Sequence, residues 1–396
     1  MALSAATNAT AGVYGKYEPR DSGYFHWTAQ WPTDEWHCGY PVLEGAEWIE
    51  LTDGQYGDFN GHNTTMLIDG HLFIGHNNHS FHAENSSGQR CLAWMYKLGA
   101  PWKRASFNKP QDGDPIQLFP LPAPMNERKF EENARYFGNP RFQKLEDGRI
   151  MALAGVFVIR RGTKLVPDGK VNTWVNICTL AREIDTSGNL GAVQIVDIGD
   201  EDAHKNAVAE GYLDYPDASA QEWVDELTPD IKLPPGRGNV AADGHRCTEF
   251  RDMIWLDEDR KRGVCMGRGE NTEEAFRGYT ARTADGGKTW DQPEPTNIPS
   301  GENTITLRRL PDGCLAIFGT FGDRDRSERR PLCIALSDDG RNFSRVFRLG
   351  GDDEKHQMVG VVFDETYMYV AGPHRSNGNR GRGEHFVLRF RLERLP

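Results

Sequence analysis

Side chains that could act in acid–base chemistry or bind an anion recur along the chain, each group directly before a run of residues with strand character. The groups are Asn60-Gly61-His62, Gly138-Asn139, His245-Arg246 with Glu249, Glu302-Asn303 and His356-Gln357. An imidazole accepts and returns a proton near neutral pH, and a guanidinium can bind a carboxylate through two parallel hydrogen bonds. The pattern predicts a polar site shared by several strand units. The alternative is that these residues only cap strand ends on a wet surface.

The strand runs that follow these groups share one pattern. An apolar run leads into an Asp-Gly or similar turn, and a second apolar run ends in small residues. Clear copies occupy residues 64–75, 141–155 and 305–319, and looser copies occupy 250–267 and 358–372. An Asp-Gly pair between alternating apolar runs is typical of a β-hairpin, and a repeated four-stranded unit is typical of a β-propeller. The innermost strands of a propeller surround one channel, so such a fold would gather the polar groups.

Two turns resemble each other and a known motif. Residues 283–290 read Thr-Ala-Asp-Gly-Gly-Lys-Thr-Trp, and residues 337–343 read Ser-Asp-Asp-Gly-Arg-Asn-Phe. The pattern resembles the Asp box of sialidase-like β-propellers, which fixes the turn between two strands of a blade. The resemblance implies a single all-β propeller over residues 1–396, with six blades favoured and five to seven possible. Residues 1–59 are expected to close the last blade, and 199–247 to form a degenerate blade or an insertion.

Composition restricts the partners. The net charge of −12 argues against nucleic acid, and no apolar run approaches the roughly 20 residues of a membrane helix. The seven cysteines include no Cys-x-x-Cys pair, which favours buried free thiols. No secretory signal is visible, so a cytoplasmic location and secretion with the signal removed both stay open.

The resemblance to sialidases extends to candidate site residues. That family binds a carboxylate with three arginines and uses a Tyr nucleophile activated by a Glu. Glu249 and Arg268 are similar to the family's Glu and second Arg, and Arg329 or Arg330 falls in the region of the third. The first Arg is matched by His62, and the Tyr position falls near His356. The resemblance implies a glycoside hydrolase acting at a uronic or sialic-type sugar, with an acidic oligosaccharide or polysaccharide as its partner.

The first repeat also resembles a second family. Residues 61–63 and 74–77 read Gly-His-Asn and Ile-Gly-His-Asn, similar to a repeat in propeller polysaccharide lyases. There a His removes the C5 proton of a uronate. The Tyr and Arg of that family are replaced by Asn139 and Gly155. A β-eliminating lyase is therefore the first alternative, and a glycan-binding propeller without turnover is the second.

The predicted site is drawn from these residues. His62, Glu249 and His356 are predicted to be catalytic. Predicted to bind substrate are Arg268, Arg329, Arg330, His76, Arg246 and Asn139. No cofactor is predicted, although His76, His79 and His82 leave a structural metal as an alternative.

Overall fold

The structure is a computed structural model, and it describes a defined set of residues. These are residues 17–19, 25–27, 42–53, 56, 59–80, 86–108, 113–124, 133–166, 169–227, 239–269, 278–298, 305–320, 332–343, 345–349, 355–356, 359–375 and 384–395.

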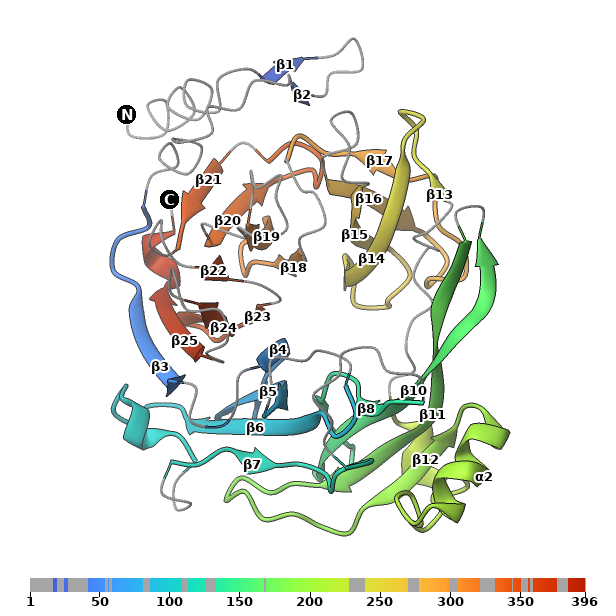
Figure 1. Ribbon diagram of the computed structural model, residues 1–396. Coiled ribbons are helices and arrows are strands. Elements are labelled where there is room, and N and C mark those ends of the chain that lie inside the picture. Colours follow the sequence, from blue (N-terminus) through green and yellow to red (C-terminus); the bar gives the residue numbers. More distant parts are fainter. Residues whose placement is uncertain are drawn as a thin grey trace.

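Five antiparallel sheets of four or five strands are arranged around a centre, as Figure 1 shows. Blade 1 contains β4 (Phe59–Ile68), β5 (His71–His79), β6 (Arg90–Lys97) and β7 (Ile116–Gln117). Blade 2 contains β8 (Arg135–Phe137), β9 (Arg141–Lys144), β10 (Ile150–Val166), β11 (Gly169–Glu183) and β12 (Gln194–Ile198).

The other three blades follow in chain order. Blade 3 contains β13 (Asn239–Val240), β14 (Arg246–Trp255), β15 (Gly263–Gly269), β16 (Gly278–Thr283) and β17 (Glu294–Pro295). Blade 4 contains β18 (Thr306–Arg309), β19 (Leu315–Thr320), β20 (Leu332–Ser337) and β21 (Arg345–Arg348). Blade 5 contains β22 (Lys355–His356), β23 (Gly360–Phe363), β24 (Tyr367–Arg375), β25 (Glu384–Arg391) and β3 (Glu47–Asp53).

The all-β propeller predicted from the sequence is confirmed. The favoured count of six blades is not, because the described residues form five such sheets. Residues 201–225 form no blade but two helices, α2 (Glu201–Ala209) and α3 (Glu222–Asp225), and α2 packs against β11 outside the ring (Figure 1). β3, from the N-terminal part of the chain, pairs with β25 and is the outermost strand of blade 5.

The remaining elements are short. They are the hairpin of β1 (Tyr17–Pro19) and β2 (Phe25–Trp27), and the 3-10 helices η1 (Arg104–Ser106) and η2 (Leu392–Arg394). No helix in the described part of the chain is long and apolar enough to cross a membrane.

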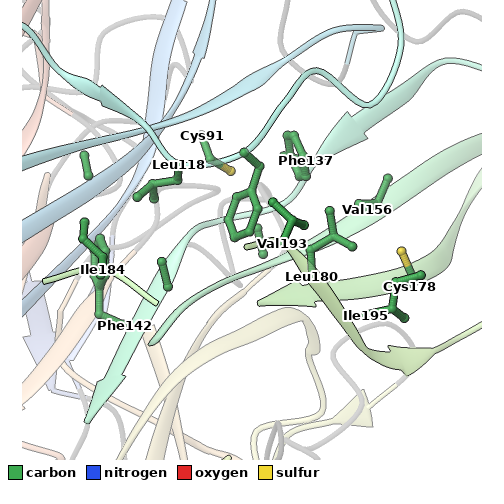
Figure 2. Packing of buried hydrophobic residues seen from close by; sticks show 14 of the residues in the cluster. Cys91, Leu118, Phe137, Phe142, Val156, Cys178, Leu180, Ile184, Val193 and Ile195 are labelled. Carbon is green, nitrogen blue, oxygen red and sulfur yellow. The ribbon is translucent and has the colours of Figure 1, made fainter. Parts of the chain in front are cut away.

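Apolar side chains fill the seams between neighbouring blades. The largest cluster joins blades 1 and 2, where the Phe73 and Phe142 rings lie 5.2 Å apart. Figure 2 shows Cys91, Leu118 and Phe137 among the buried side chains of this cluster. Similar clusters join blades 3 and 4, blades 4 and 5, and blades 5 and 1. The six described cysteines are buried and free, in keeping with the free thiols expected from the sequence.

The two turns that resemble Asp boxes have closely similar hydrogen bonds. Asp285 accepts from the Thr283 hydroxyl at 2.8 Å and from the Thr289 backbone N–H at 2.9 Å. Asp339 accepts from the Ser337 hydroxyl at 3.0 Å and from the Asn342 backbone N–H at 2.8 Å. Gly286 and Gly340 have φ values of 78° and 72°, which glycine adopts without a steric penalty. A short Asp side chain and a glycine are therefore both needed for this turn.

Candidate functional site

Described strand ends that carry predicted polar residues lie at one face of the propeller. We call it the strand-start face: it is the end at which β4, β14 and β18 begin and at which β5, β15 and β19 end. Antiparallel pairing places the start of each inner strand beside the end of the next strand. His62 lies near the start of β4, Glu249 near the start of β14, and Arg268 near the end of β15. His356 lies in β22, opposite His374 of β24.

Blade 3 places a carboxylate residue and an arginine side by side at this face. Glu249 of β14 is the direct cross-strand partner of Arg268 of β15. The register shifts on both sides of Glu249, between Cys247 and Glu249 and between Phe250 and Asp252. Such irregularities bend a strand and redirect its side chains, and they are common beside active sites. Arg268 is partly exposed, and Arg246 at the start of β14 is exposed.

The junction of blades 1 and 5 has a different character at the same face. β4 has a register irregularity between Gly61 and Thr64, which contains His62 and Asn63. The Asn63 side-chain oxygen is hydrogen-bonded to Nε2 of His385, on β25. The His385 ring stacks on His76 of β5, with ring centroids 4.3 Å apart. Both histidines have no solvent exposure.

Burial determines the protonation of this histidine pair. Desolvation, assisted by the Arg90 charge, lowers the pKa of His76 from 6.5 to about 3. Desolvation also lowers the pKa of His385 well below its usual value, with a further contribution from His76. Neither ring nitrogen of His76 has a hydrogen-bond partner among the described residues. His76 is therefore a neutral interior side chain in this structure, so its predicted contact with substrate would require it to become accessible.

Hydrogen bonds fix the neighbouring polar residues of blade 1. Asn77 donates through Nδ2 to Oδ1 of Asn139 at 3.4 Å, across the seam to blade 2. Arg90 donates to the Tyr56 carbonyl at 2.6 Å and to the Asn78 side chain. Nε2 of His79 lies 3.1 Å from the Ser87 carbonyl oxygen. Hydrogen bonds therefore hold several polar side chains at this end of blade 1.

Several predictions fall outside the described residues or lack a described side chain. Arg329, Arg330 and His82 lie outside the described ranges, and for His62, Glu249 and His356 the structure describes only the backbone placement. Their roles stay predictions. In the described ranges no group of three or more His, Cys, Asp or Glu side chains is arranged to hold a metal ion.

Sequence reasoning missed His385 and its pairing with Asn63. His385 directly precedes the apolar run of β25, and a polar residue in a buried strand is a signal that could have identified it. Its partner Asn63 is 322 positions away in the sequence, so the pairing itself required the closed ring.

Comparisons with known proteins agree with this fold. Residues 237–372 match the family of BNR repeat-like domains. A structure described as a sialidase shares 17% identity and a TM-score of 0.57, over 89% of this chain and 33% of that chain. The Trypanosoma rangeli sialidase with 2,3-difluorosialic acid shares 11% identity and a TM-score of 0.48, over 90% and 60% of the two chains.

A protein of unknown function from Dyadobacter fermentans shares 10% identity and a TM-score of 0.47, over 88% of this chain and all of that chain. The search of curated protein sequences gives no match. The chain spans about a third of the first sialidase and less than two thirds of the second. At 17% identity and a TM-score of 0.57, the likeness to the first sialidase shows a shared fold.

Proposed function

We propose that this chain is a glycoside hydrolase of the sialidase-like BNR-repeat β-propellers, and that it cleaves a linkage at an acidic sugar. The observation that carries the proposal is the cross-strand pairing of Glu249 with Arg268 at the strand-start face. A guanidinium beside an acid–base group suits a substrate with a carboxylate next to the scissile bond. Fold alone would not support this function, because propellers carry many activities.

Each predicted residue has a distinct role in the proposed mechanism. Arg268 binds the substrate carboxylate, with Arg329 or Arg330 as a second donor, because guanidinium presents two parallel N–H groups. His62 transfers the proton as base or acid. Glu249 orients a neighbouring group and raises its basicity, and His356 is the proposed group.

Two exposed or surface positions complete the proposed site. Arg246 is exposed at the start of β14, three residues before Glu249, and can add positive charge at the same face. Asn139 accepts a hydrogen bond from Asn77 between the inner strands β8 and β9 of blade 2, and would contact the sugar hydroxyl groups.

A glycan panel tests the proposal. Sialylated, glucuronylated and neutral oligosaccharides are incubated with the wild-type chain and with Arg268→Ala. New reducing ends should appear with acidic glycans, and Arg268→Ala should weaken turnover of those glycans most. Reducing ends from neutral glycans alone would contradict the acidic-sugar assignment.

The same panel separates the alternatives. β-Elimination at a uronate leaves an unsaturated sugar that absorbs in the ultraviolet, whereas hydrolysis does not. Absorbance growing with the reducing ends would identify a lyase and overturn the hydrolase. Binding without any product would identify a glycan-binding propeller.

The turns at residues 283–290 and 337–343 are proposed to be Asp boxes of this superfamily. Their shared hydrogen bonds from Thr283 or Ser337 to an Asp two positions later support the assignment. Both lie at the end of a third strand, at the opposite face from the proposed site. We therefore assign them a structural role.

A further inference from the structure

A cleft of about 500 Å³ lies on the face opposite the proposed site, and lysine and hydroxyl side chains are among the residues that line it. Its walls include His71, Lys97 and Lys103 of blade 1 and Thr186 and Ser187 of blade 2. His71 begins β5, and the other end of β5 reaches the strand-start face, so the length of a blade separates the cleft from the proposed site. Clefts of about 300–1,000 Å³ are the usual size for small-molecule sites.

The charge of the cleft is opposite to that of the whole chain. The chain has a net charge of −12, but the described lining residues include two lysines and no Asp or Glu. Neither lysine ammonium group has an ion-pair partner among the described residues, and both lysines are exposed. Local cationic side chains can attract an anion despite a negative net charge.

The nearest acidic residues on the adjoining turns are already engaged. Asp69 forms an ion pair with Lys144 of blade 2 at 2.5 Å. Asp185 accepts hydrogen bonds from the backbone N–H groups of Ser187 and Asn189, each at 2.8 Å. The carboxylates of Asp69 and Asp185 therefore already have partners. The ammonium groups of Lys97 and Lys103 stay available for a ligand.

The backbone that carries the two lysines is held firmly. The Asn108 side chain accepts from the Met95 N–H at 2.6 Å, and the Trp102 ring packs edge-on against Tyr96 with centroids 5.2 Å apart. The Leu98 N–H donates to the Gly70 carbonyl at 2.8 Å, which ties the segment to the β4–β5 turn. A fixed segment presents its side chains with less ordering cost on binding.

We propose that this cleft is a second binding site, for a small ligand that carries an oxyanion such as phosphate or carboxylate. Lys97 and Lys103 supply positive charge, and the Thr186 and Ser187 hydroxyl groups supply neutral hydrogen-bond donors from the other wall. Lysine binds such groups as a compact point charge with three donors. The site is independent of the proposed hydrolase function because it lies on the opposite face.

Titration calorimetry at constant ionic strength tests the proposal with three probes. Inorganic phosphate and sulfate represent a tetrahedral oxyanion, and glucuronate represents a carboxylated sugar. The probes are titrated into the wild-type chain, into Lys97→Glu/Lys103→Glu, and into the single variants. Lys288→Glu is the matched control, because Lys288 is an exposed lysine at the same face of blade 3.

At least one probe should bind the wild-type chain, and the double variant should weaken its Kd by about tenfold or more, equivalent to about 1.4 kcal/mol. Lys288→Glu should leave the Kd within a factor of about two, since it changes only the distant charge. The probe that binds identifies the oxyanion as tetrahedral or carboxylate. Absence of binding by all three probes, or equal binding by the double variant, would overturn the site.

Discussion

Blade 3 and the junction of blades 1 and 5 lie at the same face of the propeller, but they differ in how far their polar side chains are exposed to solvent. Blade 3 presents a partly exposed Arg268 beside Glu249, with Arg246 exposed nearby. The junction of blades 1 and 5 instead buries His76 and His385 against each other without solvent exposure. Burial keeps the histidines neutral, whereas a partly exposed guanidinium keeps its charge and can meet a substrate.

The difference separates two uses of polar side chains that look alike in the sequence. A charged group at an open strand end can select an anionic ligand, and a neutral buried pair can only organise the surrounding backbone. We therefore expect substitutions in blade 3 to act on turnover, and substitutions of the buried pair to act on stability and its pH dependence.

Loss of the proposed acid–base residue should have the largest effect. His62→Ala is expected to lower turnover of an acidic glycan by about 10²–10⁴-fold, because a positioned proton-transfer group contributes that much. Initial rates with the substrate found in the glycan panel measure it. His71→Ala, at the opposite end of blade 1, is the control and should retain wild-type rates. Equal losses in both variants would show that the effect does not come from the strand-start face.

Removal of an aromatic ring from the apolar cluster between blades 1 and 2 should destabilise the folded propeller. Phe142 is 2% exposed and packs against Phe73. Phe142→Ala is expected to cost about 3–5 kcal/mol in the free energy of unfolding, through lost burial and a residual cavity. Urea denaturation measures the change. Trp174→Ala is the control, because Trp174 is 47% exposed and should cost less than about 0.5 kcal/mol.

The buried histidines should make stability depend on pH. The pKa of His76 falls from 6.5 to about 3 on folding, so below pH 6.5 the unfolded state binds the proton more tightly. Stability is fully present above pH 6.5 and is lost as the pH falls toward about 3, at up to about 1.4 kcal/mol per pH unit for each such histidine.

Urea denaturation between pH 7 and pH 5 measures this slope. His76→Gln should flatten it, because one histidine no longer gains a proton on unfolding. His71→Gln, at the other end of β5, should leave the slope unchanged. A wild-type slope retained in His76→Gln would contradict a buried neutral His76 and remove the contrast with blade 3.

Loss of the Asp339 side chain from the turn at residues 337–343 should have the smallest effect on stability. Partial burial of Asp339 opposes ionisation, but hydrogen bonds from Asn342, Arg341 and Ser337 outweigh it and lower the pKa to about 2. Asp339→Ala is expected to cost about 1 kcal/mol in the free energy of unfolding.

The contribution of Asp339 is present above pH 3.8 and is lost as the pH falls toward about 2, a window that overlaps only the acid end of the His76 window. Thermal unfolding at pH 7 measures the loss of stability in Asp339→Ala. Asp338→Ala is the matched neighbour, since the Asp338 side chain is 91% exposed. Equal losses in the two variants would show that the turn gains nothing from the Asp339 hydrogen bonds.

Local pattern was enough to determine the class of fold. The Asp-Gly turns between alternating apolar runs are short-range signals, because side chains alternate across a strand and a hairpin needs only neighbouring residues. The repeated unit therefore predicted a propeller and the positions of His62, Glu249 and Arg268 near strand ends. The same local reasoning could not count the blades: the sequence predicts a degenerate blade or an insertion over residues 199–247, and this segment contains α2 and α3.

Only the tertiary structure decided which polar residues are exposed. His76 and Arg268 both occupy the ends of second strands, and the sequence around each is small and polar. The difference comes from the neighbour: β25 of blade 5 brings His385 onto His76, and desolvation then removes the charge. Burial depends on contacts between residues hundreds of positions apart, and only closure of the ring creates those contacts.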